Sequence, residues 1–232
     1  MSQRKAVPRF RSLLSPDLQL LDDADLLSIY AYPTSLAAPW IRANMVSSID
    51  GSAAVRGVSK GLTSAADRRL FHLLRSAADV ILIGAGTARS EPYANHTHQV
   101  VVISRSGDLP SNFFTGIRPI VLTTESLTDE RRIQLSKVSE VINCGRHDVD
   151  FNLVLELFVE RGWLKVLCEG GPALLGALNT QGLIDEVALT IAPVLVGSGT
   201  SLLQEGLEST RDFQLSSLLQ AEGNLFARYV TH

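Results

Sequence analysis

One stretch constrains the fold of this chain more than any other: the run LKVLCEGGPALLGAL from Leu164 to Leu178. Its apolar segment Val166–Cys168 is typical of a buried parallel strand, and Gly170 and Gly171 then permit a sharp turn. Pro172 suits the first turn of a helix, where its missing N–H removes no hydrogen bond. The free N–H groups of such a turn can hold a phosphate, which approaches closely because glycine has no Cβ. A plain strand-to-helix connection fits the same residues, so both interpretations stay open at this point.

Strands and helices alternate through the middle of the chain. The predicted strands are Trp40–Ser48, Val80–Ile83, Val100–Ser104, Ile120–Thr124, Glu140–Asn143 and Val166–Cys168, and the predicted helices are Ala65–Ala77, Asp129–Lys137, Phe151–Arg161 and Pro172–Gln181. This alternation favours a largely parallel sheet with helices on both faces. After a strand at Ile184–Ile191, the segments Phe213–Leu219 and Leu225–Val230 have the pattern of an antiparallel hairpin. We therefore expect an α/β fold whose mixed sheet has a parallel centre and an antiparallel C-terminal edge.

The residues before Trp40 are expected to form a separate part of the chain. They comprise a loosely held arm over residues 1–21, a short helix from Asp22 to Tyr30 and a loop that ends at Pro39. Residues 40–232 are then expected to form one domain around one sizeable core. Within this domain, the bend at Ile49-Asp50-Gly51 interrupts the first strand, and Ala53–Val55 is expected to continue the sheet.

Composition excludes several classes of function. Acidic and basic residues are interspersed and the net charge is −3, so no basic face for nucleic acid is expected. No apolar run is long enough to span a bilayer, and the basic N-terminus lacks the apolar segment of a signal peptide, which favours a cytoplasmic protein. Cys144 and Cys168 each end an apolar run and are expected to be buried thiols. The histidines are scattered, so no metal site is predicted.

Three predicted strands end in groups suited to a phosphate or a ribose. Gly84-Ala85-Gly86-Thr87 resembles the start of a dinucleotide-binding loop, although Arg89 replaces the third glycine. Ser104-Arg105-Ser106 offers hydroxyls and a guanidinium, which suit the 2′-phosphate of NADP, although a solvated polar turn has the same composition. Glu169-Gly170-Gly171 is the third. Because the carboxyl ends of parallel strands meet at one edge, we expect a pyrophosphate across the first and third turns and an adenosine 2′-phosphate at the second.

Several motifs occur in one order and at one spacing. They are Ser48-Ile49-Asp50-Gly51, Ser59 to Arg69, Leu74-Arg75, Asp79 to Thr87, Glu169 to Pro172, and Ile191-Ala192-Pro193 with Gly197. In these motifs, residues 40–231 resemble the reductase domain that follows the deaminase in RibD of riboflavin biosynthesis, which is similar in fold to dihydrofolate reductase. No zinc deaminase motif is present, so the resemblance indicates a stand-alone reductase.

The resemblance implies an NADPH-dependent reductase, usually a homodimer, that opens the ribose of a phosphorylated pyrimidine such as 5-amino-6-(5-phosphoribosylamino)uracil to a ribitol chain. It places at NADPH the residues Gly61, Thr87, Glu91, Ser104 and the run from Gly171 to Ala177, which includes Pro172, Ala173, Leu174 and Leu175. The strand-end argument adds Gly84, Gly86, Arg105 and Gly170 as cofactor-binding residues. On the substrate side, the resemblance places Ser59 and Glu169 at the pyrimidine, and Asn44, Ser48 and Thr63 are further substrate-binding candidates.

This chain departs from the family at three places. It reads Ser90-Glu91-Pro92-Tyr93-Ala94-Asn95 where the family usually has an Asp-x-Pro-x-Leu-Thr-x-Arg run that helps to grip the sugar phosphate. Asn44 replaces a usual lysine, and Gly61 replaces a usual tryptophan. Two cationic groups for a phosphorylated substrate are therefore absent from these positions.

Two carboxylates are candidate catalytic residues. Asp67 lies in the first turn of a predicted helix, at a position comparable to the carboxylate with which dihydrofolate reductases hold the pterin ring. Such a carboxylate can accept two hydrogen bonds from an aminopyrimidine edge and help to deliver a proton, but Ser64 and Asp67 also have the spacing of a capping box. Asp50 is the second candidate, and it equally suits a turn residue before Gly51.

The leading hypothesis is an NADPH-dependent reductase of a small pyrimidine. A reductase of a dihydropterin-like or dihydrofolate-like substrate is the first alternative. A protein that binds NADPH without turnover is the second. A metal-dependent hydrolase is disfavoured because the sequence shows no clustered ligands.

Overall fold

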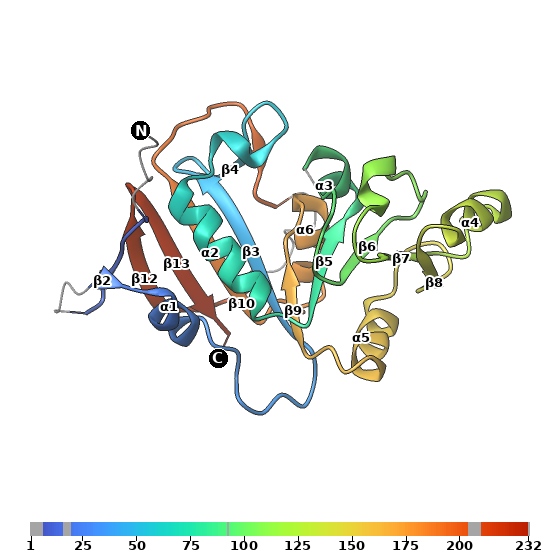
Figure 1. Ribbon diagram of the computed structural model, residues 1–232, viewed down its shortest axis with the longest axis horizontal. Helices are drawn as coiled ribbons and strands as arrows, with labels where there is room; N and C mark the ends of the chain where they lie inside the picture. Colours follow the sequence, from blue (N-terminus) through green and yellow to red (C-terminus); the bar gives the residue numbers. More distant parts are fainter. Residues whose placement is uncertain (1–6, 16–19, 92, 204–209, 232) are drawn as a thin grey trace, which may run out of the picture.

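The computed structural model describes residues 7–15, 20–91, 93–203 and 210–231. Within these residues, eleven strands form one sheet in the order β2-β1-β12-β13-β10-β3-β9-β5-β6-β7-β8 (Figure 1). The strands are β1 (Phe10–Ser12), β2 (Leu20–Leu21), β3 (Trp40–Ser48), β5 (Val80–Gly84), β6 (Val100–Ile103), β7 (Ile120–Thr123), β8 (Glu140–Asn143), β9 (Lys165–Cys168), β10 (Glu186–Ala192), β12 (Gln214–Ala221) and β13 (Asn224–Val230).

The centre of the sheet is parallel and its C-terminal edge is antiparallel, which confirms the predicted fold class. β3 pairs in parallel with β10 on one side and β9 on the other, and β5, β6, β7 and β8 continue in parallel beyond β9. β13 pairs antiparallel with both β10 and β12. The β12–β13 hairpin turns at Glu222 and Gly223, whose φ angles of 50° and 81° are those that a two-residue hairpin requires.

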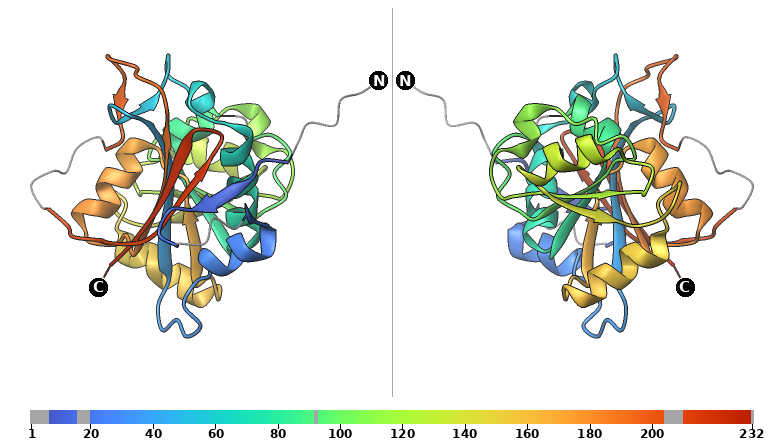
Figure 2. Two further views of the ribbon diagram at one scale, coloured as in Figure 1. Left: turned by 90° about the vertical axis from the view of Figure 1, so that its left-hand side faces the viewer. Right: turned by 90° about the vertical axis from the view of Figure 1, so that its right-hand side faces the viewer.

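Helices cover both faces of the sheet (Figure 2). They are α1 (Asp23–Ile29), α2 (Ala65–Ser76), α3 (Ala85–Ser90), α4 (Asp129–Ser136), α5 (Phe151–Glu160) and α6 (Pro172–Thr180), with the 3-10 turns η1 (Ser59–Gly61) and η2 (Ser111–Phe114). α5 and α6 pack on one face, against β3, β5 and β9. α1 and α2 pack on the other face over β10, β12 and β13, and α3 and α4 cover β6 and β7 on that same face. Side-chain caps at Asp22, Ser64, Thr128 and Asp150 begin α1, α2, α4 and α5.

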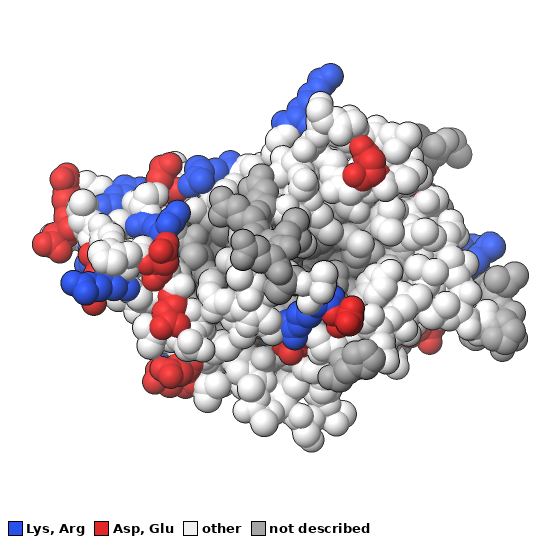
Figure 3. Space-filling model, turned by 180° about the vertical axis from the view of Figure 1, so that it is seen from behind, with Lys and Arg blue, Asp and Glu red and all other residues white. Residues whose placement is uncertain are grey.

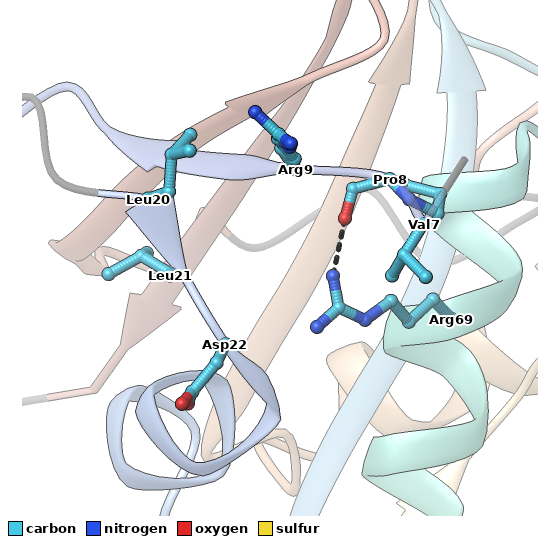
Figure 4. Close-up of a pocket in the computed structure, with 7 residues that line it drawn as sticks. All are labelled: Val7, Pro8, Arg9, Leu20, Leu21, Asp22 and Arg69. Carbon is cyan, nitrogen blue, oxygen red and sulfur yellow. Dashed lines mark hydrogen bonds between the residues drawn. The ribbon is translucent and has the colours of Figure 1, made fainter.

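The N-terminal segment is part of the sheet, so the prediction of a loosely held arm is wrong for β1 and β2. β1 pairs with β12 and β2 pairs with β1. Phe10 is fully buried, and its ring lies 4.9 Å from that of Phe226. Arg69 of α2 reaches across to donate a hydrogen bond to the carbonyl of Pro8 (Figure 4). Residues 1–6 and 16–19 of the predicted arm lie outside the described residues, and the division of the chain at residue 39 stays a prediction.

The segment after the bend also differs from the prediction. β4 (Ser52–Ala54) does not continue the main sheet but pairs antiparallel with β11 (Thr200–Ser201) in a separate two-stranded sheet. The reason is Gly51, whose φ of +81° turns the chain away from the direction of β3.

A buried ion network joins β3, β10 and β13. Arg42 Nε donates to Glu186 Oε1 at 2.6 Å, and both side chains are fully buried. Arg228 Nε donates to the same oxygen at 2.9 Å. The two arginines also donate to the carbonyls of Tyr30 and Ile29, so the network fastens the end of α1 to the sheet.

The outer surface shows mixed charge. On the face seen in Figure 3, acidic and basic side chains lie intermixed near the α4 and β8 end of the molecule, and much of the rest of that face is uncharged. Among the described residues, no helix has both the length and the apolar character needed to cross a membrane.

Candidate active site

The carboxyl ends of β5 and β9 meet at a feature that we call the glycine turn, Gly170 and Gly171. The N–H of Gly84 donates to the carbonyl of Gly170 at 2.7 Å, which joins the first and third predicted strand ends directly. A Cβ on Gly171 would lie 2.9 Å from Thr87 Oγ1, so glycine is needed for the two turns to approach this closely.

Helix α6 begins at the glycine turn, as the sequence predicts. Gly171 is its N-cap and Pro172 occupies its first turn. The N–H of Leu175 already donates to the carbonyl of Gly171. The N–H groups of Ala173 and Leu174 precede it in the first helical turn and have no acceptor within the helix. Because the positive end of the helix dipole lies here, the turn is suited to an anion.

A cavity of about 650 Å³ opens beside the glycine turn. Its volume lies in the range of about 300–1,000 Å³ that is usual for small-molecule sites. Its walls come from β3, β4, η1, α2, α3 and the glycine turn, and they include Asn44, Met45, Ala53, Ala54, Val58, Ser59, Lys60, Thr63, Asp67, Arg68, Phe71, His72, Arg75, Thr87, Glu91, Tyr93, Glu169, Gly171, Pro172 and Thr200. The cavity is therefore apolar in part and carries several ionisable groups.

The structure separates the predicted cofactor residues into two groups. Thr87, Glu91, Gly171 and Pro172 line the cavity, whereas Gly61, Gly84, Gly86, Gly170, Ala173, Leu174 and Leu175 lie in the adjoining turns and helices. Leu174 and Leu175 are buried in the core, so only their backbone remains available to a ligand. The Glu91 carboxylate accepts the N–H of Ser59 at 2.9 Å and joins α3 to η1.

Ser104 and Arg105 follow β6, which lies next to β5 on the same sheet edge. Ser104 is 2% exposed, and its hydroxyl has no hydrogen-bond partner among the described residues. Arg105 instead points to solvent and pairs with Asp148 at 2.7 Å, and both of these side chains are more than two-thirds exposed. Among the described residues, the second predicted turn thus offers one buried hydroxyl that lacks a partner and one exposed cation.

Asp67 lies on the cavity side of α2. The hydroxyl of Ser64 accepts the N–H of Asp67 at 3.0 Å, which is half of a capping box. The Asp67 carboxylate does not complete that box; it makes a side-chain hydrogen bond with Thr190 of β10. Burial raises the pKa of Asp67 above its ordinary value, while the Thr190 hydrogen bond and the charge of Arg68 act against this shift. Asp67 is thus a lining residue of the cavity whose carboxylate does not complete the capping box, and its role toward a ligand stays a prediction.

The sequence did not predict the ionic cluster of Arg75, Tyr93 and Glu169, which lines the same cavity as Asp67. Arg75 donates from Nε and Nη2 to the two carboxylate oxygens of Glu169, each at 2.7 Å, and the Tyr93 hydroxyl also donates to Glu169 Oε2. Burial, together with the charge of Glu169, raises the pKa of Tyr93 well above its ordinary value. Oε2 therefore accepts two bonds and Oε1 accepts one, so Glu169 keeps one acceptor position on Oε1 for a ligand.

The remaining substrate-side candidates also divide into residues that line the cavity and a residue that lies outside it. Asn44, Ser59 and Thr63 line the cavity. Ser48 is buried outside it, where its hydroxyl accepts the N–H of Ser52 at 2.8 Å. Pro92, in the departing run after Thr87, lies outside the described residues.

Asp50 has a structural environment and lies outside the cavity. Its carboxylate accepts the N–H groups of Val196 and Gly197 at 3.1 and 2.8 Å, so it fastens the bend to a distant loop. Hydrogen bonds with Ser48 and with these two backbone groups lower the pKa of Asp50 to about 2. These contacts are those of a residue that stabilises a turn, and the catalytic role of Asp50 stays a prediction. Within the described residues, no group of three or more His, Cys, Asp or Glu side chains is arranged to hold a metal ion.

The mixed sheet, with the glycine turn at the carboxyl ends of its parallel strands, is an α/β fold of the dihydrofolate reductase-like class. The structure is similar to a pyrimidine reductase-like protein from Corynebacterium diphtheriae, with a TM-score of 0.74, 26% sequence identity, and coverage of 89% of this chain and 98% of that protein. A riboflavin biosynthesis reductase from Saccharomyces cerevisiae has the same fold, with a TM-score of 0.66 at 18% identity over 91% of this chain and all of that one.

The sequence narrows the class further. The model of the RibD C-terminal domain matches residues 39–225, and the chain belongs to this family. A 2,5-diamino-6-ribosylamino-4(3H)-pyrimidinone 5′-phosphate reductase from Methanothermobacter thermautotrophicus is 30% identical over 190 residues, which are 75% of this chain and 88% of that protein. The riboflavin biosynthesis protein RibD of Mycobacterium tuberculosis is 31% identical over 168 residues, and the match spans 72% of this chain but only 46% of that protein. The resemblance read from the motifs is thereby confirmed.

Proposed function

We propose that this chain reduces a ribosylaminopyrimidine phosphate by hydride transfer from NADPH. The observation that carries the proposal is the position of Asp67, a partly buried carboxylate in the same cavity as the glycine turn. Such a carboxylate pairs with the amino edge of a pyrimidine, and the turn holds the phosphates of a dinucleotide. The substrate class is supported by the relative from Methanothermobacter thermautotrophicus, whose name describes a reductase of this kind.

Three observations support NADPH as the cofactor. The glycine turn leaves a space beside Thr87 that a Cβ would fill, and α6 presents its N-terminus there. Ser104 keeps a buried hydroxyl that has no partner in the described part of the chain, on the edge where a 2′-phosphate would lie. The neighbouring Arg105 would have to leave its ion pair with Asp148 to bind that phosphate. This ion pair is exposed, and exposed pairs stabilise a protein by only about 0–1 kcal/mol.

The side chains of this protein would bind, orient and shield the reactants. When bound, NADPH supplies the hydride. Asp67 accepts N–H donors of the pyrimidine with its carboxylate oxygens, and burial raises its pKa, which is the direction that a general acid needs. Arg75 and Tyr93 donate hydrogen bonds that fix the carboxylate of Glu169, and Glu169 Oε1 can then accept a hydrogen bond from the substrate. Met45, Val58 and Phe71 line the same cavity and would exclude water from the reacting atoms.

Isotope transfer tests the reaction. The chain would be incubated with the ribosylaminopyrimidinone phosphate and NADPH that carries deuterium at the nicotinamide C4 position. Deuterium in the ribityl product, found by mass spectrometry, is the expected result. Failure to bind NADPH in a calorimetric titration would remove the proposal altogether.

Two other functions have specific support. A dihydropterin-like or dihydrofolate-like substrate is the first alternative, supported by the missing family arginine after Thr87 and by the carboxylate of Asp67 on the cavity wall. Tight NADPH binding without turnover on pyrimidines and pterins would instead identify a protein that binds the cofactor without catalysis. A homodimer and a cytoplasmic location also belong to this proposal, supported by the family, and sedimentation velocity measures the first of them.

Cofactor discrimination can be tested at Ser104. A glutamate there would place a carboxylate where the 2′-phosphate is proposed to bind, and like charges repel. Ser104→Glu is therefore expected to weaken NADPH binding far more than NADH binding. Equal losses for both cofactors would contradict the assignment of the 2′-phosphate to this turn.

A further inference from the structure

The first turn of α2 is held by a glutamate from the C-terminal hairpin. The carboxylate of Glu222, in the turn between β12 and β13, accepts the N–H of Ala66 at 2.8 Å, across 156 residues of sequence. Ala66 is fully buried and belongs to the same hydrophobic cluster as Leu219 and Phe226 of that hairpin. The first N–H groups of a helix have no acceptor within the helix, so a buried helix start needs an acceptor from elsewhere. Glu222 supplies it for Ala66.

The residue that follows Ala66 is Asp67. Its N–H donates to the Ser64 hydroxyl, and its carboxylate makes a side-chain hydrogen bond with Thr190 of β10. Asp67 lines the cavity, whereas Glu222 does not. The position of the Asp67 carboxylate therefore depends on where the first turn of α2 lies, and Glu222 fixes that turn from outside the cavity.

The backbone at Glu222 is unusual for a glutamate. Its φ is +50°, in the left-handed region where a hairpin turn favours glycine, asparagine or aspartate. The side chain of Asn224 donates to the carbonyls of Ala221 and Glu222 at 3.3 and 3.2 Å and so stabilises this turn. A side chain held in such a conformation carries an energetic cost that other contacts must offset. The hydrogen bond to Ala66 is a contact of this kind.

From these contacts we infer that Glu222 is a positioning residue for Asp67. The inference rests on the proposed function, in which Asp67 contacts the pyrimidine. Without the Glu222 acceptor, the N–H of Ala66 would have to reach water, and the first turn of α2 would move together with Asp67. Misplacing a group by about 1 Å can cost about a hundredfold in rate. The hydrogen bond of Glu222 carries this role and not its charge, because the pKa of Asp67 is shifted by burial, Thr190 and Arg68.

Two substitutions at position 222 test this distinction. Glu222→Gln keeps an oxygen that can accept the N–H of Ala66. Glu222→Gly removes the side chain and suits the positive φ, so the hairpin still forms. We expect Glu222→Gly to lower kcat/KM for the pyrimidine by about ten- to a hundredfold and Glu222→Gln to stay within about threefold of the wild type. NADPH affinity is expected to stay unchanged in both variants.

Asp150→Ala is the matched control for a loss at a helix start. Asp150 accepts the N–H of Asn152 at 2.9 Å and begins α5, a helix that does not line the cavity. Its removal is expected to lower the urea midpoint, as the loss of a helix cap does, and to leave kcat/KM unchanged.

A double variant shows whether Glu222 acts through Asp67. If it does, the loss of kcat/KM caused by Glu222→Gly should largely vanish in an Asp67→Asn background, because the two residues then serve one contact with the substrate. Equal losses in the two backgrounds would overturn the inference. Wild-type kcat/KM in Glu222→Gly would also overturn it.

Carbon-13 NMR of the Asp67 carboxyl follows its position without turnover. Burial raises the pKa of Asp67, so in Glu222→Gly this pKa is expected to fall toward its ordinary value of 3.8. In Glu222→Gln and Asp150→Ala it is expected to stay at the wild-type value. An unchanged titration in Glu222→Gly would overturn the inference. A wild type that transfers no hydride would instead refute the proposed function, and the carboxyl titration would then decide by itself whether Glu222 positions Asp67.

Discussion

Replacing Asp67 by asparagine separates the two roles that its position allows. The substitution keeps the size of the side chain and leaves the bond between the Ser64 hydroxyl and the backbone N–H of residue 67 in place. It removes the negative charge and the titrating proton. A residue that only caps α2 would then affect stability, whereas a residue that binds the pyrimidine would affect kcat/KM.

The size of the kinetic effect follows from the hydrogen bonds at stake. A carboxylate that accepts two N–H donors makes two charge-assisted bonds, each worth about 1.5–3 kcal/mol. Asparagine keeps one oxygen that can accept an N–H of the pyrimidine. Its NH2 group replaces the second oxygen and faces the second N–H donor, so that hydrogen bond is lost. We expect a loss of about 2–4 kcal/mol, which is roughly 30- to 700-fold in kcat/KM. NADPH affinity is expected to stay near the wild-type value.

Stability is expected to change in the opposite direction. Burial raises the pKa of Asp67 in the folded state, so folding favours the protonated carboxyl. This contribution is fully present below the ordinary pKa of 3.8 and is lost as the pH rises through the folded value. The asparagine variant avoids that loss, so at neutral pH its free energy of unfolding should exceed that of the wild type. In more acidic buffer, below the ordinary pKa, the gain should vanish.

Steady-state kinetics and urea unfolding at the two pH values measure both effects. Asp50→Asn is the matched control, because it neutralises a carboxylate outside the cavity and should keep kcat/KM. Retention of wild-type kcat/KM by Asp67→Asn would refute the placement of the substrate at α2. A loss of stability at neutral pH would refute the argument from burial.

Three further substitutions test other parts of the structure. Gly171→Ala would place a Cβ 2.9 Å from Thr87 Oγ1. We expect at least about a tenfold loss of NADPH affinity in a calorimetric titration. Unchanged affinity would contradict the binding of the cofactor phosphates at the glycine turn. Tyr93→Phe removes one hydrogen bond to Glu169 and keeps the ring. The Michaelis constant for the pyrimidine should therefore rise roughly tenfold, with the NADPH affinity unchanged. A variant that loses only stability would contradict a role of Tyr93 in positioning Glu169. Glu186→Gln leaves two arginines without their buried counter-ion, and urea unfolding should show a loss of about 3–5 kcal/mol; a wild-type midpoint would contradict that reading.

Local sequence patterns predicted most of the fold because each strand and helix of the centre has its own signal. β3 and β8 have the predicted bounds, and the ends of α2 and α5 differ from prediction by one residue. The two missed N-terminal strands are only three and two residues long, too short for a periodicity to appear. The place of β1 in the sheet depends on pairing with β12, which lies almost a whole chain length away, and β2 in turn pairs with β1.

The candidate site was predictable where residues adjacent in sequence make it. The glycine turn was predictable because a strand, a turn and a helix start follow each other directly. Asp67 became a candidate through its place in the first turn of a predicted helix and through the resemblance to dihydrofolate reductase. The cluster of Arg75, Tyr93 and Glu169 was missed because the bonds to Glu169 cross 94 and 76 residues. At Asp50 the sequence could not decide between a catalytic acid and a turn, because the backbone groups that bind its carboxylate lie near residue 196.

The pairing of β4 with β11 means that the cavity is closed by two parts of the chain that are made at very different times during synthesis. Ala53 and Ala54 line it from one strand and Thr200 from the other. A nascent chain that already contains the glycine turn and α2 would still lack this wall until residue 200 has emerged. Competence to enclose a ligand would therefore appear late, after most of the parallel sheet has assembled.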